Sequence, residues 1–505
     1  MNYFIAQNLG VNVTGIEKSQ INRLQLFEDA GESAKCIYTN FNPRLHQNAA
    51  SFGIEGKCFS LYDYFQDTID FDETKRIGWI HRWINQNGYR VAYVPKSYDI
   101  RIYDENNLFI MYAHFDDETY TSLVYLNYFD RNGQKVKREF YDSRGFLSKI
   151  NLLRKNQEIN TELFLDRSGR IKIEKYYQLS DVHVNQLNKI VLKNYNDRDY
   201  FFNTEMAFEI FFFDCLFTES DVIFCDRNRT LAEPLSKTKK NLKICSVFHS
   251  THALDQEDVM NSSLKRVYSY VLKHPEKFKR ILVSTSQQKD DLIERFPGTL
   301  PQIEVIPVGF TDERSVDTKV KQKNKIIGVA RYSVEKQLLH QIDAVACLVE
   351  EFPDIELHLF GFGNEEKVLK DRINEKNLER NVFIRGFTTN LWEEYASSSL
   401  CILTSLIEGF SLALLEAQEA SVPIISYNVR YGPGELIQDG QNGFLVEANN
   451  QEMLVGKMRE YLLNPERQEA MMRASQENAQ RYHKNVLIQK WQDLLNSLKS
   501  NEVQV

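Results

Sequence analysis

Two of the three glutamates in the apolar stretch "SLIEGFSLALLEAQEASVPII", which begins at Ser405, have a spacing that could serve chemistry. They are Glu408 and Glu416, eight positions apart. A core helix could keep two carboxylates along a solvated edge, whereas an active site would need them. "LCILTS" just upstream has the pattern of a buried strand, "LIEGF" that of a loop, and "SLALLEAQEA" that of a helix with Ser411 near its N-terminus.

This arrangement would place Glu408 at the carboxyl end of a strand, where open α/β sheets bind their ligands. The residues that follow open the helix, and their free backbone N–H groups favour an anion or a hydroxyl. They are Gly409, Phe410, Ser411 and Leu412. Carboxylates beside such donors suit a ligand with many hydroxyl groups and a phosphate. Two bare carboxylates would also suit a metal ion, but the helix dipole there argues against a second cation.

A pair of cations follows another predicted strand, in "GVARYSVEKQ". Arg331 and Lys336 lie there, five residues apart, in a loop at the carboxyl end of the strand. Arginine supplies a planar fork of donors and lysine a point charge, so together they can neutralise a diphosphate without a metal. The alternative is a solvated loop whose two side chains face water.

Two further residues occupy the corresponding places in the N-terminal half. His249 ends the strand "KICSVFHS", and Gly15 opens a helix in "VTGIEKS". A glycine at a helix start lets the backbone approach a ligand closely. A lone histidine after a strand is often structural, with His252 the likelier bystander of the two, and Gly15 could be only a turn residue.

The elements that must position these residues alternate between strands and helices, which favours parallel α/β sheets. A region of period-two alternation, rich in aromatic residues, interrupts the first of them. We predict two doubly wound Rossmann-like domains that face a cleft, with an antiparallel β-meander inserted in the first. The expected parts are residues 1–87 (first part of the N-terminal domain), 88–198 (β-rich insert), 199–310 (second part), 311–482 (C-terminal domain) and 483–505 (a helix that returns to the N-terminal domain).

The insert contains a weak repeat of an aromatic strand, an Asp-x-x-Gly turn and a second strand. The three copies are "YFDRNGQKVKREF", "FYDSRGFLSKI" and "FLDRSGRIKIEKYY". This is the turn chemistry of tight hairpins. The aromatic residues are expected to form the insert's own core, with a carbohydrate- or protein-binding face as the alternative.

Composition excludes several classes of protein. The chain has 505 residues, 42% of them hydrophobic, so two or three globular domains are expected. Its formal net charge is −8, with no sustained Lys/Arg block, which argues against nucleic-acid binding and for peripheral membrane association at most. The seven cysteines form no CxxC pair, and no secretory leader is apparent. We therefore expect a cytoplasmic protein, which could work at the inner face of the membrane.

Taken together, these motifs resemble a known family. The Glu408–Glu416 spacing, the basic pair and "NVRYGPGELIQDGQNGFLV" look like the retaining, nucleotide-sugar-dependent glycosyltransferases of family four, which have the GT-B fold. The β-rich insert makes the chain similar to bacterial enzymes that glycosylate wall teichoic acid and to the accessory-Sec enzymes that glycosylate serine-rich adhesins. The resemblance covers nearly the whole chain.

The resemblance implies roles for four catalytic residues. Arg331 and Lys336 would hold the donor diphosphate and stabilise charge as UDP leaves. Glu408 would bind sugar hydroxyls and steady the positive reaction centre, and His249 would contact the sugar or the acceptor. Retention would follow from attack on the same face of the sugar, without an enzyme nucleophile.

The resemblance also implies a donor-binding set. Glu416 would accept hydrogen bonds from the ribose, and the Gly15–Ile16 turn would line the phosphate side, although Thr14 replaces the first glycine of the commoner Gly-Gly form. Backbone near Arg385, Gly386 and Phe387, and near Gly361–Gly363, would hold uracil. The remaining members are the helix-opening residues named above, Gly409 to Leu412.

The expected function is transfer of glucose or N-acetylglucosamine from a UDP-sugar to a teichoic acid or a serine-rich adhesin, with no metal or other cofactor. Oligomerisation or a co-subunit would use the β-rich insert. The alternatives are a non-catalytic GT-B-like partner subunit and, less in keeping with the insert, an epimerase or phosphorylase of the same fold. Two Asp-x-Asp matches, Asp70–Asp72 and Asp197–Asp199, are interpreted as surface charge rather than metal ligands.

Overall fold

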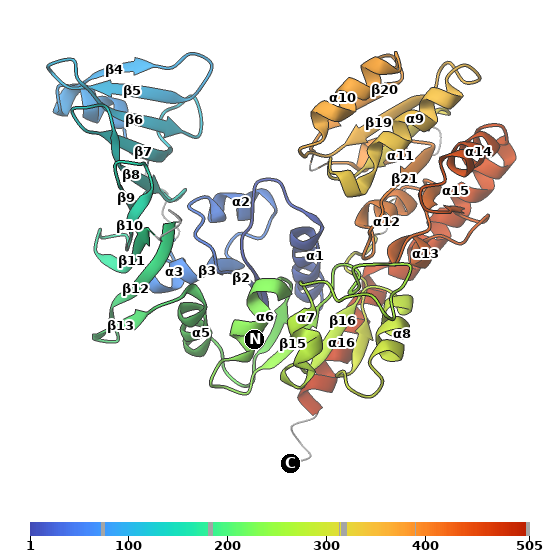
Figure 1. The fold of residues 1–505 in the computed structure, drawn as a ribbon, viewed down its shortest axis with the longest axis horizontal. Helices are drawn as coiled ribbons and strands as arrows, with labels where there is room; N and C mark the ends of the chain where they lie inside the picture. The colour runs from blue at the N-terminus through green and yellow to red at the C-terminus, as the bar shows by residue number, and fades with distance from the viewer. Residues whose placement is uncertain (72–75, 180–184, 313, 315–320, 389, 501–505) are drawn as a thin grey trace. The chain divides into compact units, whose positions relative to one another are not determined.

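A computed structural model of the chain describes residues 1–71, 76–179, 185–312, 314, 321–388 and 390–500 (Figure 1). The chain forms two compact units. The first contains residues 1–11, 34–223 and 233–242, and the second contains residues 12–33, 224–232 and 243–505. Among the described residues, none of the helices combines the length and the apolar composition that a membrane span requires.

The first unit begins with short strands whose side chains are largely buried, which favours a parallel sheet covered on both faces. β1 (Asn2–Ala6), β2 (Ala34–Tyr38) and β3 (Cys58–Ser60) pair in parallel. β14 (Val222–Cys225) spans the boundary between the two units, with Val222 and Ile223 in the first. The nearby helices are α2 (Leu45–Ser51), α3 (Leu61–Phe65), α5 (Glu205–Leu216) and α6 (Asn228–Ser236), the last of which also crosses the boundary.

The rest of the first unit is a ten-stranded antiparallel sheet, in which the strands lie side by side in chain order (Figure 1). They are β4 (Arg90–Tyr93), β5 (Asp99–Tyr103), β6 (Phe109–Phe115), β7 (Leu123–Phe129), β8 (Lys135–Tyr141), β9 (Leu147–Leu153), β10 (Ile159–Leu165), β11 (Ile171–Leu179), β12 (Asn185–Tyr195) and β13 (Arg198–Phe202). A short helix, α4 (Trp79–His81), and a π-helical turn, η1 (Arg82–Gln86), precede them. Trp79 and Trp83 pack on apolar side chains of this sheet to form its core.

The predicted hairpin turns are confirmed. The glycine of each Asp-x-x-Gly turn has a positive φ, +72° at Gly133, +91° at Gly145 and +84° at Gly169. That is the conformation for which glycine is needed in such turns. In the first turn, Asp130 Oδ1 accepts backbone N–H bonds of 2.9 Å from residues two and four positions on. Each repeat is therefore a hairpin, and all three belong to the same sheet.

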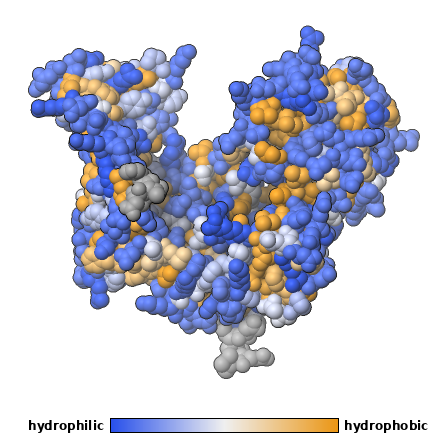
Figure 2. All heavy atoms as spheres, viewed as in Figure 1, coloured by the Kyte–Doolittle hydropathy of each residue, from blue (hydrophilic) through white to orange (hydrophobic). Residues whose placement is uncertain are grey.

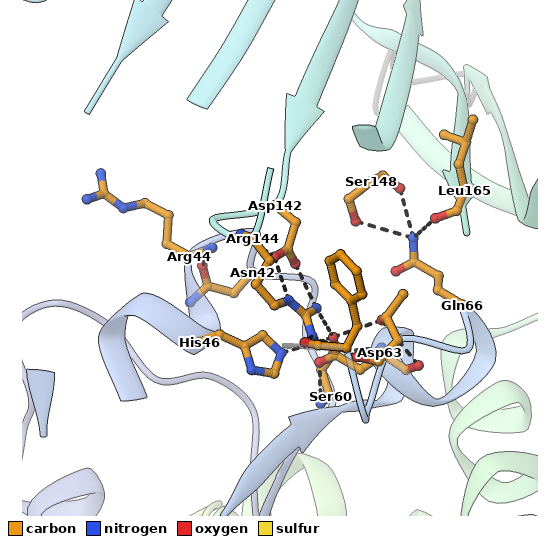
Figure 3. Close-up of polar contacts among 12 residues, drawn as sticks. Asn42, Arg44, His46, Ser60, Asp63, Gln66, Asp142, Arg144, Ser148 and Leu165 are labelled. Carbon is orange, nitrogen blue, oxygen red and sulfur yellow. Dashed lines mark hydrogen bonds and ion pairs between the residues drawn. The ribbon is translucent and has the colours of Figure 1, made fainter. Parts of the chain in front are cut away.

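Arg144, in the turn between β8 and β9, ties the antiparallel sheet to the parallel strands of the same unit (Figure 3). Its guanidinium donates to Asp63 Oδ1 at 2.7 Å and to Asp142 Oδ1 at 2.8 Å. His46 Nε2 lies 3.1 Å from the same oxygen of Asp63. The side chains of Arg144, Asp63 and Asp142 are all less than a tenth exposed. Burial alone would raise the pKa of Asp63, but its bonds with His46 and the charge of Arg144 hold that pKa well below its usual value.

Replacement of Arg144 by leucine is expected to lower the free energy of unfolding by about 3–5 kcal/mol, because it leaves two carboxylates buried without their cation. Since the pKa of Asp63 is depressed in the folded state, the bond stabilises the fold above the unfolded pKa of about 3.9 and less as pH falls below it. Urea unfolding at pH 7 measures the first effect, and the difference from wild type should shrink below about pH 4.

Arg170→Ala is the matched control, because Arg170 bonds Asp166 at 2.9 Å but is 77% exposed. It should cost less than about 1 kcal/mol. Equal losses for the two variants would contradict the assignment of Arg144 as the main tie.

The second unit holds the remaining part of the N-terminal α/β half. Its strands β15 (Lys243–Val247), β16 (Arg280–Val283) and β17 (Ile303–Val305) pair in parallel in that order. Its helices are α1 (Gly15–Asp29), α7 (Ser269–Lys273), the 3-10 turn η2 (Pro275–Lys277) and α8 (Ser286–Arg295). The C-terminal helix α16 (Lys484–Ser500) packs on α1, where the rings of Phe27 and Trp491 lie 5.4 Å apart.

The second unit also contains a six-stranded parallel sheet, in the order β20-β19-β18-β21-β22-β23. The strands are β18 (Lys325–Val329), β19 (Glu356–Phe360), β20 (Val382–Gly386), β21 (Leu400–Leu403), β22 (Ile424–Tyr427) and β23 (Gly443–Val446). Its helical elements are η4 (Val334–Lys336), α9 (Leu338–Leu348), α10 (Glu366–Glu375), α11 (Trp392–Ser397), α12 (Leu412–Glu419), α13 (Gly432–Leu436), α14 (Gln451–Leu462), α15 (Pro465–Ala479) and η5 (Gln480–Tyr482). The predicted α/β architecture, with parallel sheets and an antiparallel β-rich one, is confirmed.

The segment 311–324, which joins the two α/β halves, is described only at residues 311, 312, 314 and 321–324. Within its described part, the backbone N–H of Thr311 donates to the Tyr482 carbonyl at 3.0 Å, and that of Lys484 donates to the Thr311 carbonyl. The chain therefore touches the start of α16 as it leaves the N-terminal half. The predicted domain bounds themselves stay predictions.

Candidate active site

Three of the predicted polar residues of the second unit follow the carboxyl end of a parallel strand, whereas Glu416 lies within α12 and Arg385 within β20. His249 follows β15, Arg331 follows β18 and Glu408 follows β21, each within five residues of the strand's carboxyl end. Gly15 is the first residue of α1. The sequence pattern therefore placed these residues correctly along their elements, at the edges of sheets where α/β proteins bind ligands.

Glu408 and Lys336 form an ion pair, with Lys336 Nζ 2.7 Å from Glu408 Oε1. Both side chains are mostly shielded, at 15% exposed for Lys336 and 10% for Glu408. Hydrogen bonds hold the two loops together, since Thr404 Oγ1 donates to the Lys336 carbonyl at 3.0 Å and the Leu406 N–H donates to the Glu335 carbonyl at 2.8 Å. The carboxylate and the ammonium group are therefore held beside each other at the carboxyl edge of the six-stranded sheet.

The second predicted cation is less constrained. Arg331 is 53% exposed and pairs with Glu335, four residues on, at 2.9 Å. A surface pair of this kind is weak, so its guanidinium can exchange the carboxylate for a phosphate at little cost. The structure thus places Arg331 and Lys336 on one turn but gives each of them a carboxylate partner, which the sequence pattern did not predict.

Gly409 carries the Glu408 loop against the backbone of the N-terminal half. A β-carbon at this position would lie 2.1 Å from the His249 carbonyl oxygen and 2.6 Å from its carbon. Gly432 makes the same kind of approach to the Phe410 carbonyl oxygen, at 2.0 Å. The Tyr431 N–H donates to the Glu408 carbonyl at 2.9 Å and completes the support. Glycine is required at 409 and 432 because no side chain fits between these backbones.

The residues predicted to offer backbone N–H groups to a ligand lie at the start of α12. Ser411 precedes the helix with φ of +75°, in the left-handed region, and Leu412 is its first residue. Glu416, one turn further on, is partly buried, and the Tyr395 hydroxyl donates to it at 3.4 Å. Desolvation raises the pKa of Glu416. Phe410 is buried beneath this turn, with its ring 5.5 Å from that of Tyr482.

The two segments predicted to hold a base lie side by side. The Gly361 N–H donates to the Gly386 carbonyl at 2.9 Å, and the rings of Phe362 and Phe387 meet edge to face, with centroids 5.5 Å apart. Arg385 is exposed and its Nε contacts His358 Nδ1 at 3.2 Å, so its side chain follows the strand. An aromatic pair of this kind offers a surface on which a planar base can stack.

At the start of α1, Thr14 caps the helix in place of a glycine. Its backbone N–H donates to Glu17 Oε2 at 3.0 Å, and its hydroxyl contacts the same oxygen. Glu17 also pairs with Arg227, which follows β14. Gly15 and Ile16 therefore begin a helix in which the Glu17 carboxylate already accepts a hydrogen bond from a backbone N–H group at the N-terminus.

Asp226 is a further candidate for the site, which was not among the predicted residues. It follows β14 directly, and its Oδ1 lies 2.8 Å from His249 Nε2. Arg23 and Gln20, from α1, bond to the same carboxylate. The signal was available in "DVIFCDR", in which an aspartate ends an apolar strand in the same way as His249 ends the next.

His252, taken as the likelier bystander of the two histidines, is fully buried, and neither ring nitrogen has a hydrogen-bond partner. Desolvation, together with the charges of Arg295, Arg430 and Lys265, lowers its pKa to about 4. His252 is therefore a neutral buried residue at neutral pH. It stacks parallel to Tyr431, at a centroid distance of 6.4 Å.

Within the described ranges, no group of three or more His, Cys, Asp or Glu side chains is placed to hold a metal ion. Of the two Asp-x-Asp matches, Asp197 and Asp199 lie exposed at the β12–β13 hairpin, where Lys193 pairs with Asp199 at 2.6 Å. In the other match, Asp70 is exposed and Asp72 lies outside the described residues.

Two parallel α/β sheets, one of them with a shielded carboxylate–ammonium pair at a strand end beside a helix start, are the features expected of a GT-B glycosyltransferase. Residues 310–478 match the family of glycosyl transferases group 1. Over 98% of each chain, the fold superposes with a TM-score of 0.88 and 20% identity on the crystal structure of the pneumococcal O-GlcNAc transferase GtfA in complex with UDP and GlcNAc. The predicted resemblance and the GT-B fold are confirmed.

Two curated relatives match nearly end to end. One is the poly(ribitol-phosphate) alpha-N-acetylglucosaminyltransferase of Staphylococcus aureus, 23% identical over 98% of this chain and 99% of the relative. The other is the GtfA subunit of the UDP-N-acetylglucosamine–peptide N-acetylglucosaminyltransferase of Streptococcus parasanguinis, 23% identical over 98% of this chain and 99% of its own length.

Proposed function

We propose that this protein transfers a hexose, glucose or N-acetylglucosamine, from a UDP-sugar to a polyol-phosphate polymer or a serine-rich protein, with retention at the anomeric carbon. The observation that carries the proposal is the Glu408–Lys336 pair, held 2.7 Å apart beside the start of α12. The relatives named above support the choice of donor and of acceptor. Transfer breaks the bond between the anomeric carbon and the UDP oxygen and forms one to an acceptor hydroxyl oxygen, whose proton leaves with UDP.

The protein's part in this step is electrostatic. Lys336 and Arg331 can both turn from their carboxylates to the diphosphate, and so stabilise the charge that develops as UDP leaves. Glu408, released in part from Lys336, would face the positive charge on the sugar ring. The N–H groups at the start of α12 and the Glu416 carboxylate supply donors and an acceptor for hydroxyl groups. This chemistry needs no protein-bound metal.

A non-catalytic subunit is the second candidate. A degenerate copy would be expected to have lost part of the charged set, whereas Arg331, Lys336, Glu408 and Glu416 are all present. The ion pair and the close approach at Gly409 also keep Glu408 in place, which a merely structural domain would not need. These observations favour the enzyme.

We further propose that the antiparallel sheet binds a second copy of the chain or a co-subunit. It displays large apolar side chains to solvent, including Tyr93 at 55% and Phe201 at 64% exposed. Figure 2 shows hydrophobic residues among the hydrophilic ones in the region of this sheet. Light scattering tests this point, because a monomer with full activity on a polymer would contradict it.

UDP release is expected from one of the two donors when the matching acceptor is present. UDP-glucose and UDP-N-acetylglucosamine would each be offered with ribitol- or glycerol-phosphate polymer, and separately with a serine-rich peptide. Mass spectrometry of the product identifies the sugar, and NMR of its anomeric proton identifies the configuration. UDP binding without turnover on any pair would favour the non-catalytic reading, and an inverted product would overturn retention.

A further inference from the structure

The Asp226 carboxylate is fully buried and is bonded on both oxygens. Oδ1 lies 2.8 Å from His249 Nε2 and accepts from Arg23 Nη2 at 2.8 Å. Oδ2 accepts from Gln20 Nε2 at 2.9 Å and from Arg23 Nη1 at 3.2 Å. Four contacts from three side chains leave the carboxylate no freedom to rotate.

The charge of this group is set by Arg23. Its guanidinium forms a two-point bond with Asp226 and lies over the rings of Phe224 and Trp491, with the guanidinium carbon 5.4 and 5.3 Å from the ring centroids. Burial opposes ionisation of Asp226, but the charge of Arg23 and the bond with His249 outweigh it, so its pKa lies well below the usual value. Asp226 therefore stays ionised and can only accept hydrogen bonds.

Because the Asp226 carboxylate accepts hydrogen bonds but cannot donate one, it determines which ring nitrogen of His249 carries the proton. Nε2 must donate to Asp226, so in the neutral ring Nδ1 has a lone pair and no proton. Among the described residues, Nδ1 has no hydrogen-bond partner. The ring is 9% exposed, so only a small part of it is open to a ligand.

Hydrogen bonds also fix the backbone of His249. The N–H groups of His249 and Ser250 both donate to the Tyr268 hydroxyl, at 2.8 and 2.9 Å. The His249 carbonyl is the group that Gly409 packs against, one residue from Glu408. The ring and the backbone of His249 are therefore both fixed next to the Glu408 loop.

We infer that Asp226 is a positioning residue, which keeps His249 protonated on Nε2 so that Nδ1 accepts a hydrogen bond from a substrate hydroxyl group. The inference rests on the proposed function for the identity of that hydroxyl, which belongs either to the donor sugar or to the acceptor. Arg23 and Gln20 act through Asp226 by keeping it ionised and oriented.

Asp226→Asn tests the inference, since an asparagine can turn its NH2 group to Nε2 and so place the ring proton on Nδ1 instead. The turnover number is expected to fall about 10- to 100-fold, the usual cost of losing a group that orients another. The dissociation constant of UDP alone should stay within about twofold of the wild-type value, because Nδ1 serves a hydroxyl of the sugar or the acceptor. A rise in KM for the UDP-sugar alone would assign the hydroxyl to the donor, and a rise for the polymer or peptide alone would assign it to the acceptor.

The double variant separates positioning from a structural role. In the His249→Gln background, Asp226→Asn should change transfer by less than about twofold, because there is no ring left to orient. An undiminished further loss there would overturn the inference. Asp142→Asn is the control, since Asp142 is also buried and is bonded to an arginine, Arg144, with no hydrogen bond to a histidine among the described residues; it should leave turnover within about twofold.

A measurement on the wild-type protein does not depend on activity or on any variant's folding. Nitrogen NMR of histidine-labelled protein, with the His249 signal identified by its loss in His249→Gln, is expected to show the proton on Nε2 and a shift towards Nδ1 in Asp226→Asn. A wild-type ring protonated on Nδ1 would overturn the inference. If no donor–acceptor pair is turned over, the proposed function fails while the tautomer measurement still decides the role of Asp226.

Discussion

Replacement of Glu408 by glutamine is expected to lower the turnover number for sugar transfer about 100- to 1000-fold, the range found when one electrostatic partner of a transition state is removed. Glutamine keeps the size and one oxygen acceptor for Lys336 but not the negative charge. The carboxylate lies 2.7 Å from Lys336 and is shielded from water, so its charge acts with little screening. Initial rates of UDP release, at saturating donor and acceptor, measure the effect.

Two results separate chemistry from binding in this experiment. UDP binding, measured by calorimetry, should weaken by less than about tenfold, since Lys336 and Arg331 remain. Glu366→Gln is the control, because Glu366 forms an exposed surface pair with Lys370 at 2.6 Å, and this variant should transfer at the wild-type rate. A Glu408→Gln protein within threefold of wild type would remove Glu408 from the active site.

Replacement of Gly409 by alanine is expected to cost about 1–3 kcal/mol of stability or more, and about 100-fold in transfer. The added β-carbon would lie 2.1 Å from the His249 carbonyl oxygen. The backbone fixes the position of a β-carbon, and the oxygen is itself a backbone atom, so the clash cannot be relieved by rotation of a side chain. Either the Glu408 loop or the His249 loop must shift. Thermal unfolding and UDP release, measured on the same sample, show whether stability, activity or both are lost.

Gly456→Ala is the matched control for this clash. Gly456 lies within α14, and a β-carbon there would meet no atom within 4 Å. Alanine in the interior of a helix should stabilise the fold by about 0.5–1 kcal/mol and leave transfer unchanged. A Gly409→Ala protein with wild-type stability and activity would show that the contact between the two loops is not needed.

The fold was predictable from local patterns of the sequence. Apolar runs such as "LCILTS" and "KICSVFHS" determine strands, and the residue after each run lies at the sheet's carboxyl edge. Asp130 and Gly133 determine a hairpin turn within four residues, since the aspartate accepts backbone bonds and the glycine takes a positive φ. Such features depend only on neighbours in the chain.

Part of the candidate site was predictable for the same reason. Glu408, Arg331, Lys336 and His249 were found because each follows a recognisable strand. The uracil role of Arg385 to Phe387 and the ribose role of Glu416 stay predictions, since they depend on a ligand's pose. Asp226 ends an apolar strand in the same way, but its role depends on contacts with Arg23, Gln20 and His249 that the sequence does not show.

The sequence by itself determined the α/β architecture, the hairpins of the insert and the strand-end positions of the charged residues. Only the tertiary structure decided which of them are partners. Lys336 meets Glu408 across 72 positions, Arg144 meets Asp63 across 81, and His249 meets Asp226 across 23. The reason is physical: periodicity encodes which face of an element is buried, whereas a hydrogen bond between distant segments depends on how their elements pack.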